Sequence, residues 1–327
     1  MNYRILGKTG LKVSEISLGT WQVGGKWGSE FNQKNAEEII NIAIDNGVNF
    51  LDTADVYSDG LSEKIVGKVV RSRKEEVYIA TKCGRFLDPH VSSAYQPAVL
   101  RKFVENSLSN LGVERIDLIQ LHCPPTEVYY RPEIFELFEV LTKEGKIRNY
   151  GVSVANVEEA LKAIEYPGVS TVQIIFNMFR QRSSELFFRE AKAKDVGIIA
   201  RVPLASGLLT GKFGKNSTFS EEDHRFFNRK GEVFDKGETF SGIDFDLGLQ
   251  AVEELKHIFK DQNLVHKALQ WILAFEEVSC IIPGASSVSQ LLSNLDTFSA
   301  TPLLESDVEK VNAIYKKYIK KEVHHLW

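Results

Sequence analysis

The chain has little of several features that would mark particular classes of protein. It holds only three cysteines in 327 residues, at positions 83, 123 and 280, and their odd number and wide spacing argue against a disulfide framework or a zinc site. No run approaches the roughly 18 apolar residues of a membrane span, and the N-terminus lacks the apolar stretch of a signal peptide. We therefore expect a cytoplasmic protein with no membrane partner and no bound metal.

The chain also lacks an excess of charge of either sign, with a net charge of −4 and a pI near 6.0. Such a balance gives no reason to expect nucleic acid or an anionic membrane as a partner. The basic run at 316–321 alternates with apolar residues at helical spacing, which indicates the solvated face of a helix. Hydrophobic residues make up 43% of the chain, enough for a large core.

Strand-like and helix-like segments alternate along the chain. Eight strand-like runs are rich in Val, Ile and Leu without strict alternation: 13–19, 50–52, 77–82, 116–122, 150–154, 172–176, 197–202 and 280–283. Helical spacing is found over 34–46, 62–70, 97–111, 131–142, 157–164, 184–194, 249–259, 264–275, 288–298 and 305–319. Continuous apolar strands are typical of a parallel sheet covered on both faces.

Eight such units predict an α/β protein of the (β/α)₈ TIM barrel type, folded as a single domain over 1–327. An open doubly wound sheet is the alternative, but its G-x-G-x-x-G signature is absent after the first strand. Residues 1–12, with turn residues at 7–10, predict an N-terminal hairpin that plugs one end of the barrel. A long loop at 204–246 follows the seventh strand, and loops of that length are usually functional lids or disordered. A helix closes the chain.

Four polar residues lie where strands end. Asp52, Lys82 and His122 close the second, third and fourth strands, and Tyr57 follows Asp52 by five positions. Each residue alone has an ordinary explanation, such as an ion pair or a packed aromatic ring. Together they lie at the end of the barrel that carries catalytic groups. A phenol is too weak an acid for neutral pH, but a nearby ammonium favours its ionised form and a carboxylate holds that ammonium. The group predicts a proton-transfer site.

The same segments make the chain resemble the aldo-keto reductases over nearly its whole length. The matching segments are Gly-Val-Asn-Phe-Leu-Asp-Thr-Ala-Asp-Val-Tyr at 47–57, Ala-Thr-Lys at 80–82, Asp-Leu-Ile-Gln-Leu-His at 117–122, Gly-Val-Ser at 151–153 and Ile-Pro-Gly-Ala at 282–285. The resemblance implies an enzyme that reduces an aldehyde or ketone with NAD(P)H by hydride transfer. By that resemblance Tyr57 is the general acid, Lys82 lowers its pKa, Asp52 holds Lys82, and His122 orients the carbonyl of a small-molecule substrate.

The resemblance further implies a nucleotide site. The cofactor-binding residues it suggests are Gly19, Thr20, Trp21, Asp52, Ser153, Gln173, Arg201, Pro203, Leu204, Ser206, Gly207, Leu208, Lys212, Gly284, Ser286, Gln290 and Asn294. Among them Ser153 and Gln173, with Asn177, would hold the carboxamide, 203–212 would bind the pyrophosphate, and the last four would meet the adenosine. An ordinary helix cap is the other explanation for Ser286. Trp21, Tyr57 and His122 would contact substrate, beside wall residues Trp27, Phe86, Tyr129 and 219–240.

Several positions depart from the family pattern. Val154 replaces an asparagine found in many members, and Arg201 stands where an aromatic ring commonly stacks on the nicotinamide. Gly284 and Gln290 replace cations that hold the 2′-phosphate, although Lys212 or Lys215 would compensate. We expect NADP(H) as the cofactor, with NAD(H) as the alternative. Two other functions are considered: a cofactor-binding regulatory subunit like those of potassium channels, and a barrel enzyme that uses Lys82 as a Schiff-base amine. A paired Asp52 disfavours the second, because it keeps the amine charged.

Overall fold

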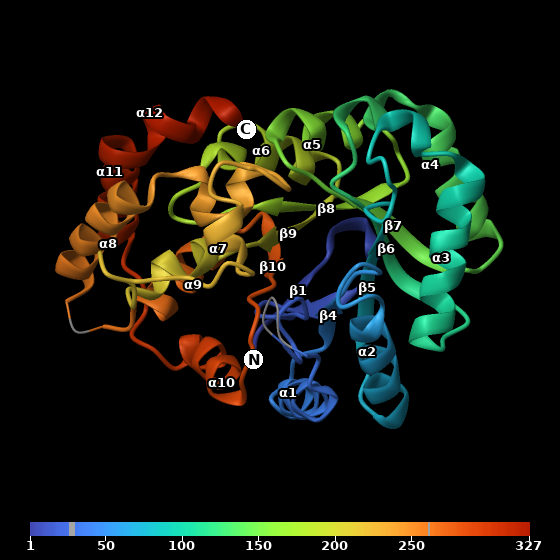
Figure 1. The fold of residues 1–327 in the computed structure, drawn as a ribbon, viewed down its shortest axis with the longest axis horizontal. Helices are drawn as coiled ribbons and strands as arrows, with labels where there is room; N and C mark the ends of the chain where they lie inside the picture. Colours follow the sequence, from blue (N-terminus) through green and yellow to red (C-terminus); the bar gives the residue numbers. More distant parts are fainter. Residues whose placement is uncertain (26–29, 261) are drawn as a thin grey trace.

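The computed structural model describes residues 1–25, 30–260 and 262–327, so Trp27 lies outside the described residues. Its centre is a sheet of eight parallel strands in the order β10-β9-β8-β7-β6-β5-β4-β3 (Figure 1). The strands are Leu18–Gly19 (β3), Phe50–Asp52 (β4), Tyr78–Cys83 (β5), Ile116–His122 (β6), Ile147–Ser153 (β7), Val169–Ile175 (β8), Gly197–Arg201 (β9) and Val278–Ile281 (β10). Each of the eight predicted strand segments therefore contributes to one sheet.

The first and last strands meet and close the sheet. Isolated parallel bridges join Ile16 to Ile281 and Gly19 to Gly284. The backbone N–H of Gly19 donates to the carbonyl of Pro283 at 3.2 Å. A side chain at Gly19 would bring its Cβ within 2.8 Å of the Ile282 carbonyl oxygen, so the close approach of the two strands depends on glycine. The predicted (β/α)₈ barrel is confirmed.

Helices surround the barrel (Figure 1). They are Gln33–Asp45 (α1), Leu61–Ser72 (α2), Pro97–Leu111 (α3), Pro132–Lys143 (α4), Val157–Ala163 (α5), Phe187–Ala193 (α6), His224–Phe227 (α7), Phe245–Phe259 (α8), Leu264–Leu273 (α9), Val288–Leu295 (α10), Glu305–Ile314 (α11) and Lys320–Val323 (α12). Their ends follow the local sequence: Pro97 occupies the first turn of α3, and Gly112 ends it at φ 63°. No helix of the described residues is long and apolar enough to cross a membrane.

Alternate strand residues pack into two different cores. Leu51, Ile79 and Ile119 belong to the large cluster between strands and helices. Their neighbours Phe50, Ala80 and Leu118 point into the barrel and pack there with apolar side chains of the N-terminal hairpin, Leu6, Leu11 and Val13. The lower barrel interior is therefore filled with apolar side chains, which leaves the C-terminal ends of the strands for polar ones.

The hairpin reaches further along the chain than the sequence predicted. It consists of Tyr3–Ile5 (β1) and Lys12–Ser14 (β2), which pair antiparallel. Residues 13 and 14, predicted as the start of the first barrel strand, thus belong to the hairpin, and the strand itself is only Leu18–Gly19. The Asn49 side chain accepts a hydrogen bond from the Ser14 N–H at 2.7 Å, which holds the chain beside the barrel before it turns inward. The mixture of apolar and polar residues at 13–19 gives no sign of that bend.

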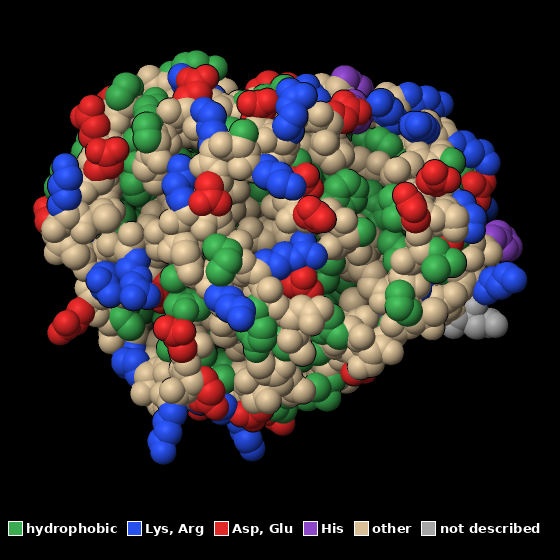
Figure 2. Space-filling model, turned by 180° about the vertical axis from the view of Figure 1, so that it is seen from behind, with side chains coloured by type: hydrophobic (Ala, Val, Ile, Leu, Met, Phe, Trp, Pro, Cys, Tyr) green, Lys and Arg blue, Asp and Glu red, His purple; other side chains and the backbone are tan. Residues whose placement is uncertain are grey.

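The long loop at 204–246 is ordered into short helical pieces. These are Ala205–Thr210 (η5), α7, Lys236–Glu238 (η6) and Phe240–Gly242 (η7). The ring of Phe219 lies 5.2 Å from that of Phe213 and 5.7 Å from that of Phe240. This aromatic cluster gives the loop a small core of its own. Elsewhere acidic and basic side chains are interspersed, as the face in Figure 2 shows.

Candidate active site

Lys82, Asp52 and Tyr57 lie in direct contact at the C-terminal ends of β4 and β5. The Lys82 Nζ atom donates to Asp52 Oδ2 at 2.5 Å, to the Thr53 carbonyl at 2.7 Å and to the Tyr57 hydroxyl at 3.3 Å. Asp52 and Lys82 are in phase with Phe50 and Ala80, whose side chains point into the barrel. The strand period therefore carries both charged side chains to the inner face, directly above the apolar filling.

His122 completes the predicted group. It ends β6 in phase with the inward-facing Leu118, and its ring centroid lies 5.9 Å from that of Tyr57 at an interplanar angle of 81°. Its Nδ1 atom is buried and has no hydrogen-bond partner among the described residues. A buried polar atom of this kind is usually satisfied by a ligand or water. The structure thus gathers all four residues that the sequence singled out.

The environment sets the ionisation of these groups. Burial raises the pKa of Tyr57, and although Lys82 opposes that shift, the pKa stays above its ordinary value. Burial alone would lower the pKa of Lys82, but the charges of Asp52 and Tyr57 outweigh it and the pKa is raised. Burial, followed by the positive charges of Arg85 and other cations, holds the pKa of His122 well below its ordinary value. At neutral pH the phenol is protonated, the ammonium charged and the imidazole neutral.

Two glutamines support Asp52 from across the barrel. Gln173 Nε2 donates to Asp52 Oδ1 at 2.8 Å, and Gln120 Nε2 approaches the same oxygen at 3.4 Å. The sequence placed Gln173 at a carboxamide, whereas here its amide holds the carboxylate. Gln120 was missed, although its position two residues before His122 puts it on the same face of β6. That spacing could have indicated that Gln120 faces the site.

Residues predicted around the nicotinamide have protein partners. Ser153 ends β7, with its Oγ 3.5 Å from Cys123 Sγ. Asn177 donates from Nδ2 to the Val202 carbonyl and to Ser241 Oγ, both at 2.9 Å. Asn177 therefore ties the end of β8 to the long loop.

The structure also shows where Thr20, Trp21 and the predicted pocket wall residues lie. Thr20 Oγ1 donates to the Asp52 carbonyl at 3.1 Å. The Trp21 side chain is 36% exposed and its ring lies 5.1 Å from that of His224. Tyr129, predicted as a pocket wall residue, is fully buried in the helix-side core, and its hydroxyl donates to the Ser153 carbonyl at 3.4 Å. That prediction is wrong because the ring packs behind the strand end. Phe86 remains exposed.

The predicted nucleotide strap contacts the long loop. Ser206 Oγ donates to the Glu238 carbonyl at 2.7 Å and accepts from the Phe240 N–H at 3.1 Å. Its neighbours in the strap are Pro203, Leu204, Gly207, Leu208 and Lys212, of which Leu208 is fully buried and Lys212 is exposed.

The segment predicted to meet the adenosine forms the start of α10. Ser287 caps the helix, and Gln290 Oε1 accepts from the Ser286 N–H at 2.9 Å. Asn294 Nδ2 donates to the Gly284 carbonyl at 3.3 Å. These are the contacts of an ordinary helix start, which was the other explanation of this segment.

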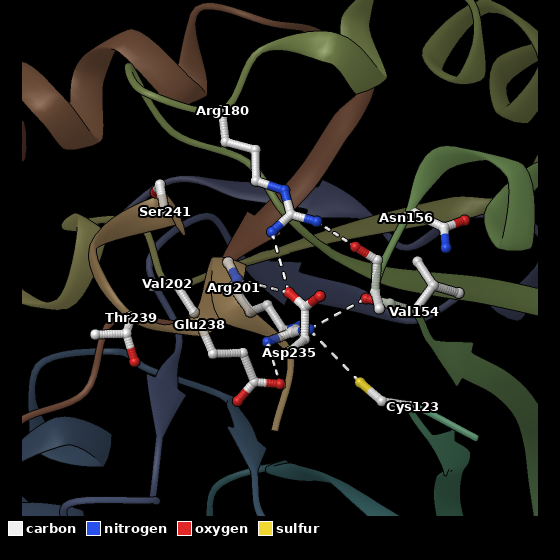
Figure 3. Close-up of polar contacts among 12 residues, drawn as sticks. Cys123, Val154, Asn156, Arg180, Arg201, Val202, Asp235, Glu238, Thr239 and Ser241 are labelled. Carbon is white, nitrogen blue, oxygen red and sulfur yellow. Dashed lines mark hydrogen bonds and ion pairs between the residues drawn. The ribbon is translucent and has the colours of Figure 1, made fainter. Parts of the chain in front are cut away.

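Arg201 lies across the mouth of the barrel (Figure 3). Its Nη2 donates to the Val154 carbonyl at 3.1 Å and contacts Cys123 Sγ at 3.5 Å, while Nη1 lies 3.3 Å from Glu238 Oε1. Arg180 points to the same loop and pairs with Asp235 at 3.5 Å (Figure 3). The sequence pointed to Arg201 and, through the predicted wall segment 219–240, to the part of the loop that carries the two acids, but not to Arg180.

The chain is similar to known proteins along nearly its full length. The model of the aldo/keto reductase family matches residues 15–316. The aldo-keto reductase YhdN of Bacillus subtilis (strain 168) is 31% identical over 331 residues, covering 99% of this chain and 96% of that protein. A probable voltage-gated potassium channel subunit beta of Arabidopsis thaliana is 27% identical over 337 residues, covering 98% of each. The solved glycerol dehydrogenase of Gluconobacter oxydans has a TM-score of 0.77 and 27% identity, covering 97% of this chain and 96% of that one.

Proposed function

The chain belongs to the aldo/keto reductase family of oxidoreductases, and from that membership we propose that it reduces aldehyde or ketone carbonyls to alcohols with a nicotinamide cofactor. The observation that carries the proposal is the position of Lys82 Nζ between the Asp52 carboxylate and the Tyr57 hydroxyl. A phenol, an ammonium and a neutral imidazole that meet at one point suit proton donation to a developing alkoxide.

The residues present fit a bound cofactor. Among the buried polar atoms that have no hydrogen-bond partner within the described residues, Gln120 Oε1, His122 Nδ1 and Arg201 Nε lie towards the C-terminal ends of β6 and β9. Such atoms are normally satisfied, so their gathering at one end supports a ligand there. When bound, a nicotinamide cofactor supplies the hydride.

Each of the four residues has a role in the proposed reaction. Tyr57 donates its proton to the carbonyl oxygen as negative charge builds there. Lys82 stabilises the resulting phenolate, and Asp52 holds the ammonium in place. His122, neutral at working pH, orients the carbonyl by a hydrogen bond. Each such preorganised contact is typically worth about 3 kcal/mol in the transition state.

We place the cofactor along the residues that the sequence suggested. Gly19, Thr20, Trp21, Ser153, Gln173 and Arg201 would surround the nicotinamide, the strap at 203–212 would hold the pyrophosphate, and Gly284, Ser286, Gln290 and Asn294 would meet the adenosine. NADP(H) is the proposed form, with Lys212 and Lys215 as the cations that would face the 2′-phosphate.

A steady-state assay tests the proposal. The purified protein is mixed with NADPH or NADH and a panel of aliphatic, aromatic and hydroxylated aldehydes and ketones. We expect loss of the reduced cofactor in step with formation of the matching alcohol. Cofactor binding without turnover of any carbonyl would contradict the proposal and favour a regulatory role, the alternative suggested by the similarity to the plant channel subunit. Borohydride trapping tests a Schiff base at Lys82, which its ion pair with Asp52 disfavours.

A further inference from the structure

Two arginines from different strands converge on one carboxylate oxygen at the mouth of the barrel. Arg85 follows β5 and Arg201 ends β9, so they come from opposite parts of the barrel wall. Their Nη1 atoms lie 3.6 and 3.3 Å from the same Oε1 atom of Glu238. Glu238 belongs to the long loop and not to a strand of the barrel. The two guanidiniums thus form an anion site that a loop side chain occupies.

Glu238 satisfies these arginines poorly. Both contacts are longer than the roughly 2.7–2.9 Å of strong charge-assisted hydrogen bonds. Elsewhere in the structure Arg101 holds Glu144 through two such bonds, at 2.6 and 2.9 Å. The Nε atom of Arg201 is buried without a partner among the described residues. A free carboxylate or phosphate, not tied to a loop backbone, would reach a better geometry with the same pair.

The pair lies within electrostatic reach of the reacting groups. Arg201 contacts Cys123, the neighbour of His122, and Arg85 is three residues past Lys82. After burial, the charge of Arg85 is the largest influence that lowers the pKa of His122, and Arg201 acts in the same direction. An anion held here would therefore lie beside a carbonyl that meets Tyr57 and His122.

The side chains at the mouth of the barrel carry a net positive charge. Three guanidiniums, of Arg85, Arg180 and Arg201, face two carboxylates, of Asp235 and Glu238. Burial alone would raise the pKa of Glu238, but the surrounding cations, Arg201 first, keep it below its ordinary value, so the carboxylate is charged. Lys82 and Asp52 neutralise each other below. The mouth therefore favours an incoming anion even before Glu238 moves.

We propose that the Arg85–Arg201 pair binds an anionic group of the substrate, a carboxylate or a phosphate carried by the aldehyde, in place of the Glu238 carboxylate. The inference rests on the proposed carbonyl reduction and names its substrate class. Arg201 can serve both ligands, because a guanidinium stacks on a ring through its face and binds oxygen atoms at its edge. Glu238 then acts as an internal competitor that covers the site when no substrate is present.

Matched substrate pairs test the inference. The specificity constant kcat/KM is compared for 4-oxobutanoate against butanal, and for glyceraldehyde 3-phosphate against glyceraldehyde. The first pair tests a carboxylate and the second a phosphate. We expect at least one anionic partner to be preferred by on the order of tenfold or more, with the gain mainly in KM and reduced by added salt. Equal constants in both pairs would overturn the inference while leaving carbonyl reduction intact.

Three variants locate the effect. Arg85→Gln should bring the charged-to-neutral ratio of kcat/KM close to one, and Glu238→Gln should raise that ratio by about two- to tenfold because the competitor is gone. Arg101→Gln removes an arginine of similar exposure, with 29% of its side chain accessible against 23% for Arg85, from an ion pair on the outer helices. This control should keep the wild-type ratio. An Arg85→Gln variant with an unchanged ratio would contradict the assignment.

A binding measurement separates this inference from the proposed function. Succinate and inorganic phosphate are titrated calorimetrically into the full-length protein, which needs no turnover. We expect at least one to bind, more weakly to Arg85→Gln and more tightly to Glu238→Gln. If no aldehyde is reduced but succinate or phosphate binds in this order, the anion site stands and the proposed function fails. If neither anion binds wild type or Glu238→Gln, the anion site is refuted whatever the assay shows.

Discussion

The Lys82 ammonium and the Asp52 carboxylate form an ion pair of 2.5 Å in which the two side chains are only 1% and 3% exposed. Removal of one partner from a buried pair leaves the other charge unpaired in the interior. We therefore expect Lys82→Met to lower the free energy of unfolding by about 3–5 kcal/mol. Asp52→Asn added to it should restore part of that loss. Urea unfolding of both single variants and the double variant measures the coupling, and strictly additive losses would contradict it.

Tyr57→Phe should lower kcat for carbonyl reduction by about 10² or more, because the ring stays but the proton donor is lost. The dissociation constant of the reduced cofactor, measured by fluorescence titration, should stay near the wild-type value. Tyr130→Phe is the matched control, since that side chain is 64% exposed and lies outside the site. An unchanged kcat in Tyr57→Phe would remove the phenol from the acid role.

Asp55 predicts a pH dependence of stability. Burial, and then the charge of Glu63, raises the pKa of Asp55 to about 7. The folded protein thus holds a proton that the unfolded chain releases near its ordinary pKa, so this group costs stability as pH rises from about 4 to 7. Its Oδ1 accepts from the Val56 N–H, while its buried Oδ2 has no partner among the described residues.

Asp55→Asn keeps that accepting oxygen and removes the charge. We expect it to stabilise the protein at pH 8 by on the order of 2 kcal/mol and to have little effect at pH 4. Thermal unfolding at both pH values measures this. The exposed Asp59→Asn serves as the control and should show no such difference between the two pH values. An equal gain from Asp55→Asn at pH 4 would show that charge is not the cause.

Lys212 tests the choice of cofactor. If it faces the 2′-phosphate, Lys212→Ala should weaken NADPH binding by about two- to fivefold and leave NADH binding unchanged, since only NADPH carries that group. Lys310→Ala, on α11 and paired with Asp307, is the comparison. Titration of both cofactors against all three proteins gives the answer. Equal losses for the two cofactors would place Lys212 elsewhere.

The sequence was enough to predict the barrel and the four central residues. Asp52, Lys82 and His122 each end an apolar run, and the parallel order of the strands brings those ends together. The helix ends were readable for the same local reason, as at Gly112, where a positive φ ends α3. These features depend on residues close in sequence and on one simple topology.

Contacts between distant segments were not predictable in this way. Glu238 contacts Arg85, which is more than 150 residues away in the sequence, and local patterns do not encode contacts over that separation. The loop that carries Glu238 also has no regular hydrophobic period. The hydrogen bond from Gln173 to Asp52 crosses the barrel between strands that are not neighbours. The predicted length of β3 was wrong for another reason. Val13 is apolar and Ser14 is small, so both residues suit the hairpin as well as a barrel strand.

The closure between β3 and β10 also sets where the molecule opens first. Strands β6 and β7 share a register of many consecutive pairs, whereas in the described part of the chain isolated bridges at Ile16 and Gly19 join the first and last strands. Sub-global opening begins where the fewest bonds must break. The amide protons of Ser17 and Gly19 should thus exchange with deuterium well before those of Leu118 and Gln120, and the barrel wall should open beside β3, whose pairing with β4 is also short, while β6 and β7 stay paired.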